Sequence, residues 1–127
     1  MTYSWTNDNI EIGLPAEGTG NLDFLATNNS EQPITANITV TPTFTNGGNS
    51  NQGDPINFSI SVNPTAQINN IENIVVTDGE LIGPVEFTTI NTGGTTTYQW
   101  TNDNTDIGIA NSGNENISEF AAVNDGD

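Results

Sequence analysis

The 127-residue chain contains no Lys, Arg or His and sixteen Asp and Glu residues, which gives a formal net charge of −16. This charge repels nucleic acids and anionic membranes, so both classes of partner are excluded, and side-chain salt bridges cannot form within the chain. The chain also lacks cysteine, which excludes disulfides, thiol nucleophiles and thiolate metal sites.

Targeting signals are also missing from the sequence. No apolar run reaches the length needed to cross a membrane, which predicts no membrane insertion. No basic or apolar leader precedes the first strand pattern. We interpret Met1 as the start of an excised fragment or as an arbitrary numbering origin.

Short alternating segments predict strands along the first half of the chain. Residues 3–6 alternate aromatic and polar side chains, and brief strands are expected at residues 10–14 and 24–27. The alternation is clearest in residues 34–41, where every even position is apolar, and Pro42 is expected to mark the edge or end of that strand.

A polar loop over residues 46–53 separates this strand from residues 56–62, which alternate again, so the two runs predict a long hairpin. Asn63-Pro64-Thr65 is the expected domain boundary, because a proline stiffens the junction between tandem modules. No stretch has helical periodicity. Further strands are expected at residues 71–76, 85–90, 98–102, near 107 and at 117–123.

The chain contains an internal repeat. Residues 97–109 match residues 2–14, 95 positions earlier, with nine of thirteen residues identical. Self-similarity at a fixed period indicates a slice of a repeat array. The match continues through Gly18/Gly113, Asn21/Asn116 and Leu22/Ile117, and after one extra residue through Phe24/Phe120, Ala26/Ala122 and Asn28/Asn124.

Joining the two copies gives one module of about seven short strands in roughly 95 residues, the size of an Ig-like antiparallel β-sandwich. The predicted fold class is therefore all-β. Residues 1–64 would be the C-terminal part of one module, without its first two strands. Residues 65–127 would be the N-terminal part of the next module, without its last two.

Each partial module would expose unpaired strand edges. Two kinds of partner would cover them. Flanking sequence completes each module in the native protein, as neighbouring repeats of one array, or separate copies donate strands to one another in a homo-oligomer or filament.

The Tyr-x-Trp pair with an Asx-rich turn, together with Ile38-Thr39-Val40-Thr41-Pro42, resembles the polycystic-kidney-disease (PKD) family of Ig-like domains. The family's Trp-Asp-Phe-Gly-Asp-Gly turn is replaced here by Trp100-Thr101-Asn102-Asp103-Asn104. Residues 3–42 are more specifically similar to the PKD-like repeats of very large secreted Bacteroidota surface proteins, including gliding-motility adhesins. The resemblance implies type IX secretion, attachment to the bacterial cell surface and a long multi-module stalk.

Carboxylates near the repeated turn are candidate calcium ligands, because calcium prefers six to eight oxygen atoms. No Asp-x-Asx-x-Asx-Gly loop accompanies them, so the alternative is a solvated Asx turn. The candidates are Asp8 and Glu11 in the first copy and Asp103 and Asp106 in the second, followed by Asp54, Asp78 and Glu80 near the module ends.

Trp5 and Trp100 are candidates for stacking on sugar rings, but aromatic residues in the centre of a strand usually pack in a core, and Tyr3 and Tyr98 share that interpretation. Without His, Lys, Arg or Cys, nucleophilic triads and Schiff bases cannot be built. A chance pair among sixteen acids is uninformative about glycosidase chemistry. Gly93-Gly94 has no following Lys to bind phosphate.

The sequence therefore predicts a non-catalytic extracellular structural repeat of a bacterial cell-surface adhesin, which spaces and presents a distal binding tip. Two alternatives stay open. One is a carbohydrate-binding module that recognises polysaccharide through exposed aromatic residues. The other is a linker module made rigid by calcium.

Overall fold

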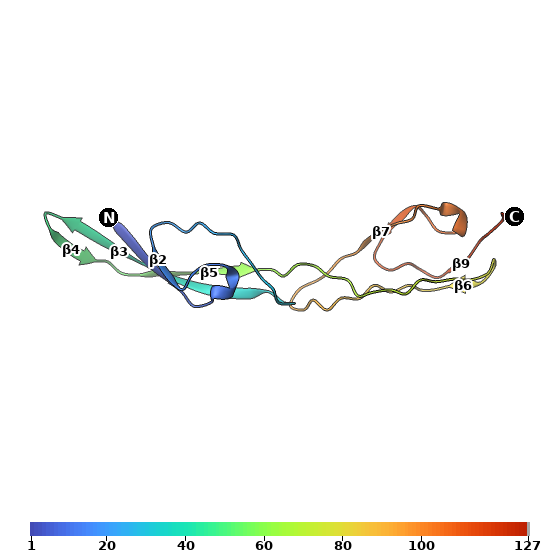
Figure 1. Ribbon diagram of the computed structural model, residues 1–127, viewed down its shortest axis with the longest axis horizontal. Coiled ribbons are helices and arrows are strands. Elements are labelled where there is room, and N and C mark those ends of the chain that lie inside the picture. Colours follow the sequence, from blue (N-terminus) through green and yellow to red (C-terminus); the bar gives the residue numbers. More distant parts are fainter. Residues whose placement is uncertain (127) are drawn as a thin grey trace. The chain divides into compact units, whose positions relative to one another are not determined.

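The structure, a computed structural model, describes residues 1–126, which form two compact units (Figure 1). Unit 1 contains Met1–Thr65 and the short segment Thr92–Gly94, and unit 2 contains Ala66–Asn91 and the chain from Thr95 onward. Every strand pairing in the described residues is antiparallel, and their helical elements are two single 3₁₀ turns. The predicted all-β antiparallel class is confirmed.

Unit 1 is built around its longest strand, β3 (Ile34–Asn46), which lies in the middle of the sheet (Figure 1). On one side β3 pairs with β1 (Thr2–Asn7), which pairs in turn with β2 (Glu17–Thr19). On its other side β3 pairs with β5 (Ile56–Val62) and, further along, with β4 (Asn49–Gln52). Strand β3 therefore pairs directly with every other strand of this sheet except β2.

The predicted long hairpin is confirmed, but its connection differs from the prediction. Residues 46–53 are not a polar loop: β4 forms within them and pairs with the end of β3. The turn between the strands consists of Gly47 and Gly48, whose φ angles are 61° and 84°. Two consecutive positive φ angles define the two-residue turn that matches strand twist, and glycine adopts them without steric cost.

Of the two expectations for Pro42, that it marks the end of the strand is wrong, because β3 continues for four residues beyond it. Proline has no N–H to donate to a ladder. Its carbonyl accepts a hydrogen bond from Gly53 N–H at 2.9 Å. Gly53 lies in the gap between β4 and β5, and the N–H and carbonyl of a strand residue point to the same side. The missing donor of Pro42 therefore faces a place where the neighbouring strand is already interrupted.

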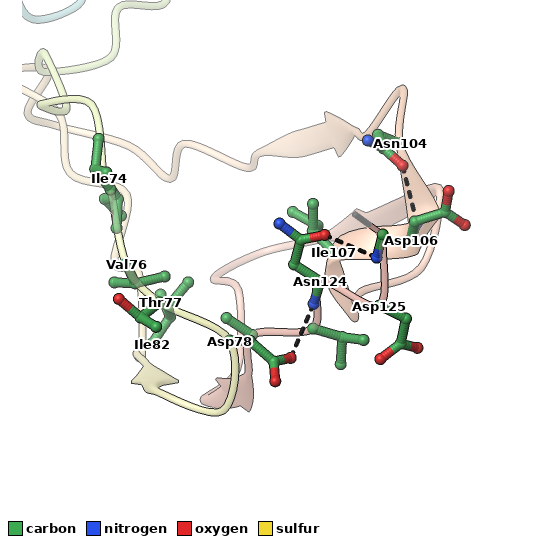
Figure 2. A pocket seen from close by; sticks show the side chains of 14 residues that line it. Ile74, Val76, Thr77, Asp78, Ile82, Asn104, Asp106, Ile107, Asn124 and Asp125 are labelled. Atoms are coloured by element: carbon green, nitrogen blue, oxygen red, sulfur yellow. Dashed lines mark hydrogen bonds between the residues drawn. The ribbon is translucent and has the colours of Figure 1, made fainter.

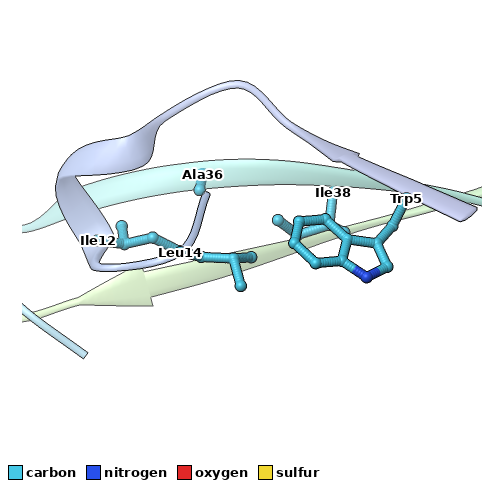
Figure 3. Packing of buried hydrophobic residues seen from close by; sticks show 5 residues of the cluster. All are labelled: Trp5, Ile12, Leu14, Ala36 and Ile38. Carbon is cyan, nitrogen blue, oxygen red and sulfur yellow. The ribbon is translucent and has the colours of Figure 1, made fainter. Parts of the chain in front are cut away.

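The core of unit 1 lies on one face of β3 (Figure 3). Ala36 and Ile38 have no exposed surface, and they alternate along the strand with exposed Thr and Asn residues. Trp5 from β1 is 7% exposed, and Ile12 and Leu14 from the repeated turn complete the cluster. The prediction that Trp5 packs in a core is confirmed. Burying one such aliphatic side chain stabilises the fold by about 1.5–3 kcal/mol.

Unit 2 contains two separate two-stranded pairs and one isolated bridge, between Val85 and Ile117. The pairs have only two or three residues in each strand. They are β6 (Leu81–Ile82) with β9 (Phe120–Ala121), and β7 (Gln99–Thr101) with β8 (Ser112–Asn114).

Three of the strands predicted outside the repeated segment do not form. Residues 24–27 and 71–76 contain no strand, and residues 85–90 keep only the bridge at Val85. In unit 2, the counterpart of residues 24–25 pairs with β6. Unit 1 contains no counterpart of β6, so the same sequence pattern has no partner there. Residues 71–76 are exposed at every position, so their apolar side chains cover no core.

One backbone position distinguishes the two units. After β2, Gly20 has a φ of 79° and donates its N–H to the Tyr3 carbonyl at 2.9 Å. After β8, Glu115 occupies the equivalent place with a φ of 62° and donates to the Tyr98 carbonyl at the same distance. A side chain in this left-handed conformation costs roughly 1–2 kcal/mol that glycine avoids.

We expect Glu115→Gly to stabilise unit 2 by roughly 0.5–1 kcal/mol, the strain relieved less the extra backbone entropy that glycine loses on folding. Amide hydrogen exchange in β7 and β8 measures the effect on unit 2 alone. Glu115→Gln is the control, because it removes the same charge but keeps the strain. Equal stabilisation by both substitutions would show that charge repulsion, and not backbone conformation, limits this turn.

Candidate functional site

The repeated segment, residues 3–14 and 98–109, forms the same local structure twice, and we call it the Trp–Asn motif. Asn9 and Asn104 each accept a hydrogen bond on Oδ1 from the backbone N–H two residues on, at 3.0 Å. Each asparagine thereby caps a single 3₁₀ turn, η1 (Ile10–Ile12) or η2 (Thr105–Ile107). The short strands predicted at these places are wrong, because an Asx cap closes the backbone into a turn.

Each turn ends at a glycine in the left-handed conformation, with φ of 103° at Gly13 and 112° at Gly108. A β-carbon on Gly13 would overlap the Leu25 carbonyl, and one on Gly108 would lie 2.7 Å from the Ala121 carbonyl. These positions therefore require glycine for both backbone conformation and space.

A second asparagine stabilises the motif through side-chain hydrogen bonds to backbone groups. Nδ2 of Asn7 donates to the carbonyls of Leu14 and Pro15 at 2.8 and 3.3 Å, and Oδ1 accepts from the N–H two residues on at 3.0 Å. Asn102 makes the equivalent bonds, at 3.3, 3.2 and 3.0 Å. The sequence predicted an Asx-rich turn with amide oxygens available to calcium at these positions, but not these internal hydrogen bonds, although the identity of the residues in the two copies was visible.

The tryptophan ring of each motif lies against a glycine of the neighbouring strand. Trp5 is paired with Gly18, and Trp100 with Gly113, and an added β-carbon at either glycine would overlap the indole ring. Both indole N–H groups are buried without a hydrogen-bond partner in the described residues. An unpaired buried donor costs about 1–3 kcal/mol, so both copies carry the same cost.

The surroundings of the two motifs differ. In unit 1, β1 pairs with β2 on one side and with β3 on the other, whereas in the described part of unit 2, β7 pairs with β8 alone. Ile12 is therefore fully buried, while its equivalent Ile107 is 39% exposed. The described residues of unit 2 contain no counterpart of β3 and β5, and its motif is left open on the face that these strands cover in unit 1.

Unit 1 is open at a different place. Tyr98 packs against Phe87 with ring centroids 5.7 Å apart, but unit 1 contains no counterpart of Phe87. Tyr3 is accordingly 44% exposed, so the prediction that it packs in the core is wrong. Tyr3 and Trp5 lie on the same face of β1, so Tyr3 is on the side of the sheet that carries the core. Its exposure follows from the lack of a partner ring such as Phe87.

Asp8 forms the polar link between the motif and β3. Its two carboxylate oxygens accept hydrogen bonds from the Asn37 backbone N–H at 2.7 Å and from Asn37 Nδ2 at 3.0 Å. The backbone N–H chiefly, and the side-chain amide next, lower the pKa of Asp8 from its ordinary value of 3.8. Among the described residues no group faces the equivalent Asp103 in this way.

The candidate calcium ligands do not form an acidic cluster. Among residues 1–126, no three acidic side chains converge closely enough to hold a metal ion. Asp8 already accepts two hydrogen bonds from Asn37, and Glu11 and Asp106 each lie in the first turn of a 3₁₀ element. Calcium binding by Asp8, Glu11, Asp103 or Asp106 stays a prediction.

A groove with a volume of about 1140 Å³ lies beside η2 in unit 2 (Figure 2). Asp78 accepts a hydrogen bond from Asn124 N–H at 2.9 Å, and Gly79 N–H donates to the Ala122 carbonyl at 2.8 Å, which joins the two walls at one end. The apolar side chains in its lining are Ile74, Val75, Val76, Ile82, Ile107, Ala122 and Val123.

Comparison with known proteins adds no relationship: no family model, no curated protein and no solved structure matches this chain. In the part of the chain that the structure describes, no helix is long and apolar enough to cross a membrane.

We expect Asn7→Ala to destabilise unit 1 by about 1–3 kcal/mol, because it leaves buried carbonyls and an N–H without their partner. The matched substitution Asn102→Ala should cost less, since Asn102 is half-buried whereas Asn7 is 6% exposed, so water can replace the lost bonds. Amide hydrogen exchange measured separately in β1 and β7 tests this. An equal loss in both units would contradict the role assigned to burial.

The Asp8 interaction should make unit 1 sensitive to acid. Because the folded-state pKa of Asp8 is lowered, its contribution is present above the ordinary carboxyl pKa and is lost as pH falls through the folded-state pKa. We expect Asp8→Asn to lower the melting temperature at about pH 7, with a difference from wild type that shrinks as the pH falls below the ordinary carboxyl pKa of 3.8. Circular dichroism melts over this range give the measurement.

Asp103→Asn is the matched control, because it removes one charge from the equivalent place without breaking the bonds to Asn37. It should lower the melting temperature at about pH 7 less than Asp8→Asn does. If both substitutions behaved alike, general charge repulsion and not the Asp8–Asn37 contact would govern the acid response.

Proposed function

We propose that this chain is part of a non-catalytic, extracellular array of Ig-like repeats that serves as a structural spacer in a bacterial cell-surface adhesin. The observation that carries the proposal is the duplicated Trp–Asn motif. Two copies reproduce the same cap, the same asparagine bonds and the same tryptophan–glycine contact. An array is the arrangement in which one local structure recurs at a fixed interval.

The strand pairings support an Ig-like module when the two copies are considered together. Strands β1, β3 and β5 lie side by side in unit 1, which is the C-F-G order of Ig-like sandwiches. The Val85–Ile117 bridge in unit 2 corresponds to the B–E pairing of the other sheet. Each unit supplies the pairing that the other lacks.

Composition supports a spacer exposed outside the cell. Like charges repel along an array and favour an extended chain of modules, and a net charge of −16 also favours solubility. A trypsin-like protease recognises Lys or Arg through an acidic specificity pocket. This chain has neither residue and offers no such cleavage site. The partners implied by an array are neighbouring repeats of the same protein.

The burial of Trp5 counts against a carbohydrate-binding role for the first motif. A sugar-stacking residue must present a ring face to solvent, but this indole is 7% exposed and is covered by its own sheet and core. The repeated tryptophan therefore supports a structural role, in which it fixes the spacing between β1 and β2.

Cell-surface labelling tests the proposal. An antibody raised against this chain should label intact cells of the organism that makes it, and proteinase K added to those cells should remove the label. An antibody against a cytoplasmic protein is the control, because it should bind only after permeabilisation. Labelling by the chain-specific antibody only after permeabilisation would refute a surface role.

A further inference from the structure

We infer that the open edge of β7 and the groove beside η2 bind the β3–β5 hairpin of a second copy of this chain, in the register that β3 has on β1. The site rests on the repeat architecture of the proposed function, in which further copies of the repeat supply such hairpins. It does not depend on where the protein is located.

Unit 1 shows how such a hairpin is held. Its β3 pairs with β1 through Trp5–Val40, Thr6–Thr39 and Asn7–Ile38. Residues 97–102, which include β7, repeat the sequence of β1 except that Gln99 stands in place of Ser4. The edge of β7 that corresponds to the β3-paired edge of β1 has no strand partner in the described residues. A strand with an open edge presents unpaired N–H and carbonyl groups that favour addition of another strand.

The residues that make the polar contacts fixing the register are repeated directly after β7. In unit 1, Asp8 accepts two hydrogen bonds from Asn37, and Asn9 Nδ2 donates to the Thr35 carbonyl at 3.3 Å. The equivalent residues Asp103 and Asn104 are exposed. A hairpin in the β3 register would bring Asn37 and Thr35 of the second copy to these two side chains.

The apolar surfaces also correspond. On η1, Ile12 is buried in a cluster with Ala36 and Ile38 of β3. On η2, the equivalent Ile107 projects into the groove of unit 2, opposite Ile74 and Val76 (Figure 2). The alternating apolar face of a second β3 strand would cover Ile107 as the first one covers Ile12.

Charge favours this segment over other parts of the chain. Residues 34–62 contain one acidic residue, Asp54, whereas the remaining residues carry fifteen of the sixteen acids. The groove itself includes Asp78, Asp106 and Asp125. A partner surface rich in carboxylates would be repelled there, while the nearly uncharged hairpin can approach.

Two whole chains gain nothing by exchanging hairpins. A hairpin that leaves β1 to bind β7 of another molecule covers one edge and opens an equivalent one, with the same number of strand pairings. We therefore expect the chain alone to stay monomeric. The probe is a synthetic peptide of residues 31–65, which has no β1 strand to leave.

Disulfide trapping tests the register, because the natural chain contains no cysteine. In the inferred register Thr101 lies opposite Thr39 of the peptide, as Thr6 does in unit 1. The Thr101→Cys chain should form a disulfide with a Thr39→Cys peptide at least about tenfold faster than with a Thr43→Cys peptide, because four residues of a strand span roughly 13 Å, beyond disulfide reach.

The free peptide could be too poorly structured to bind. The second test therefore uses a chain that is extended after Asp127 by a second copy of residues 31–65, because linkage raises the local concentration of the hairpin. Amides of β7 should become protected from hydrogen exchange in this chain. Replacing Asp103 by Asn should weaken that protection severalfold, whereas unit 1 stays unchanged.

Equal trapping by the two peptides, or no protection of β7 in the extended chain, would overturn the inference. So would protection of β7 in the chain alone while it is monomeric, since another part of the same chain would then occupy the edge. These outcomes are independent of surface labelling. A positive trap without labelling would keep the hairpin site and reject the location proposed for the protein.

Discussion

The structure of unit 1 depends on the pairing of β3 with β1. This pairing buries Trp5, places Ala36 and Ile38 over Ile12, and brings Asn37 to the carboxylate of Asp8. Apolar burial provides most of the free energy, whereas the charged hydrogen bonds provide the register. A shift of one residue would turn the apolar face of β3 to solvent and also separate Asp8 from its donors.

The two units show what the Trp–Asn motif can and cannot do alone. Its cap, its internal asparagine and its glycine contacts form in both places, so they require only local sequence. Burial does not follow automatically. Ile107 is exposed without a second β3, and Tyr3 is exposed without a counterpart of Phe87. The motif is therefore a local framework, and long-range strands determine whether it encloses a core.

Alternation of apolar and polar residues was sufficient to predict β1, β3 and β5. In β3 one face is buried and the other solvated, whereas the apolar face of β5 is only partly covered, with Ile56 63% and Phe58 40% exposed. Alternation failed where tertiary context decides. Residues 10–14 alternate like a strand, but an asparagine cap and a left-handed glycine turn them into η1. Residues 71–76 are rich in Ile and Val like a strand, yet they form none and are exposed at every position. The groove of unit 2 could not be predicted, because it arises from a strand that unit 2 does not contain.

The absence of cations determines how the exposed face of the sheet is stabilised. Cross-strand ion pairs are not available to a chain without Lys, Arg or His. Uncharged polar pairs take their place between β3 and its neighbours: Thr35 with Ser61, Thr39 with Asn57 and Thr45 with Ser50, at 2.9, 2.7 and 2.9 Å. Because these pairs carry no charge, the hairpin avoids the repulsion that carboxylates on adjacent strands would cause. The sequence can thus concentrate its acids elsewhere and still form a continuous sheet.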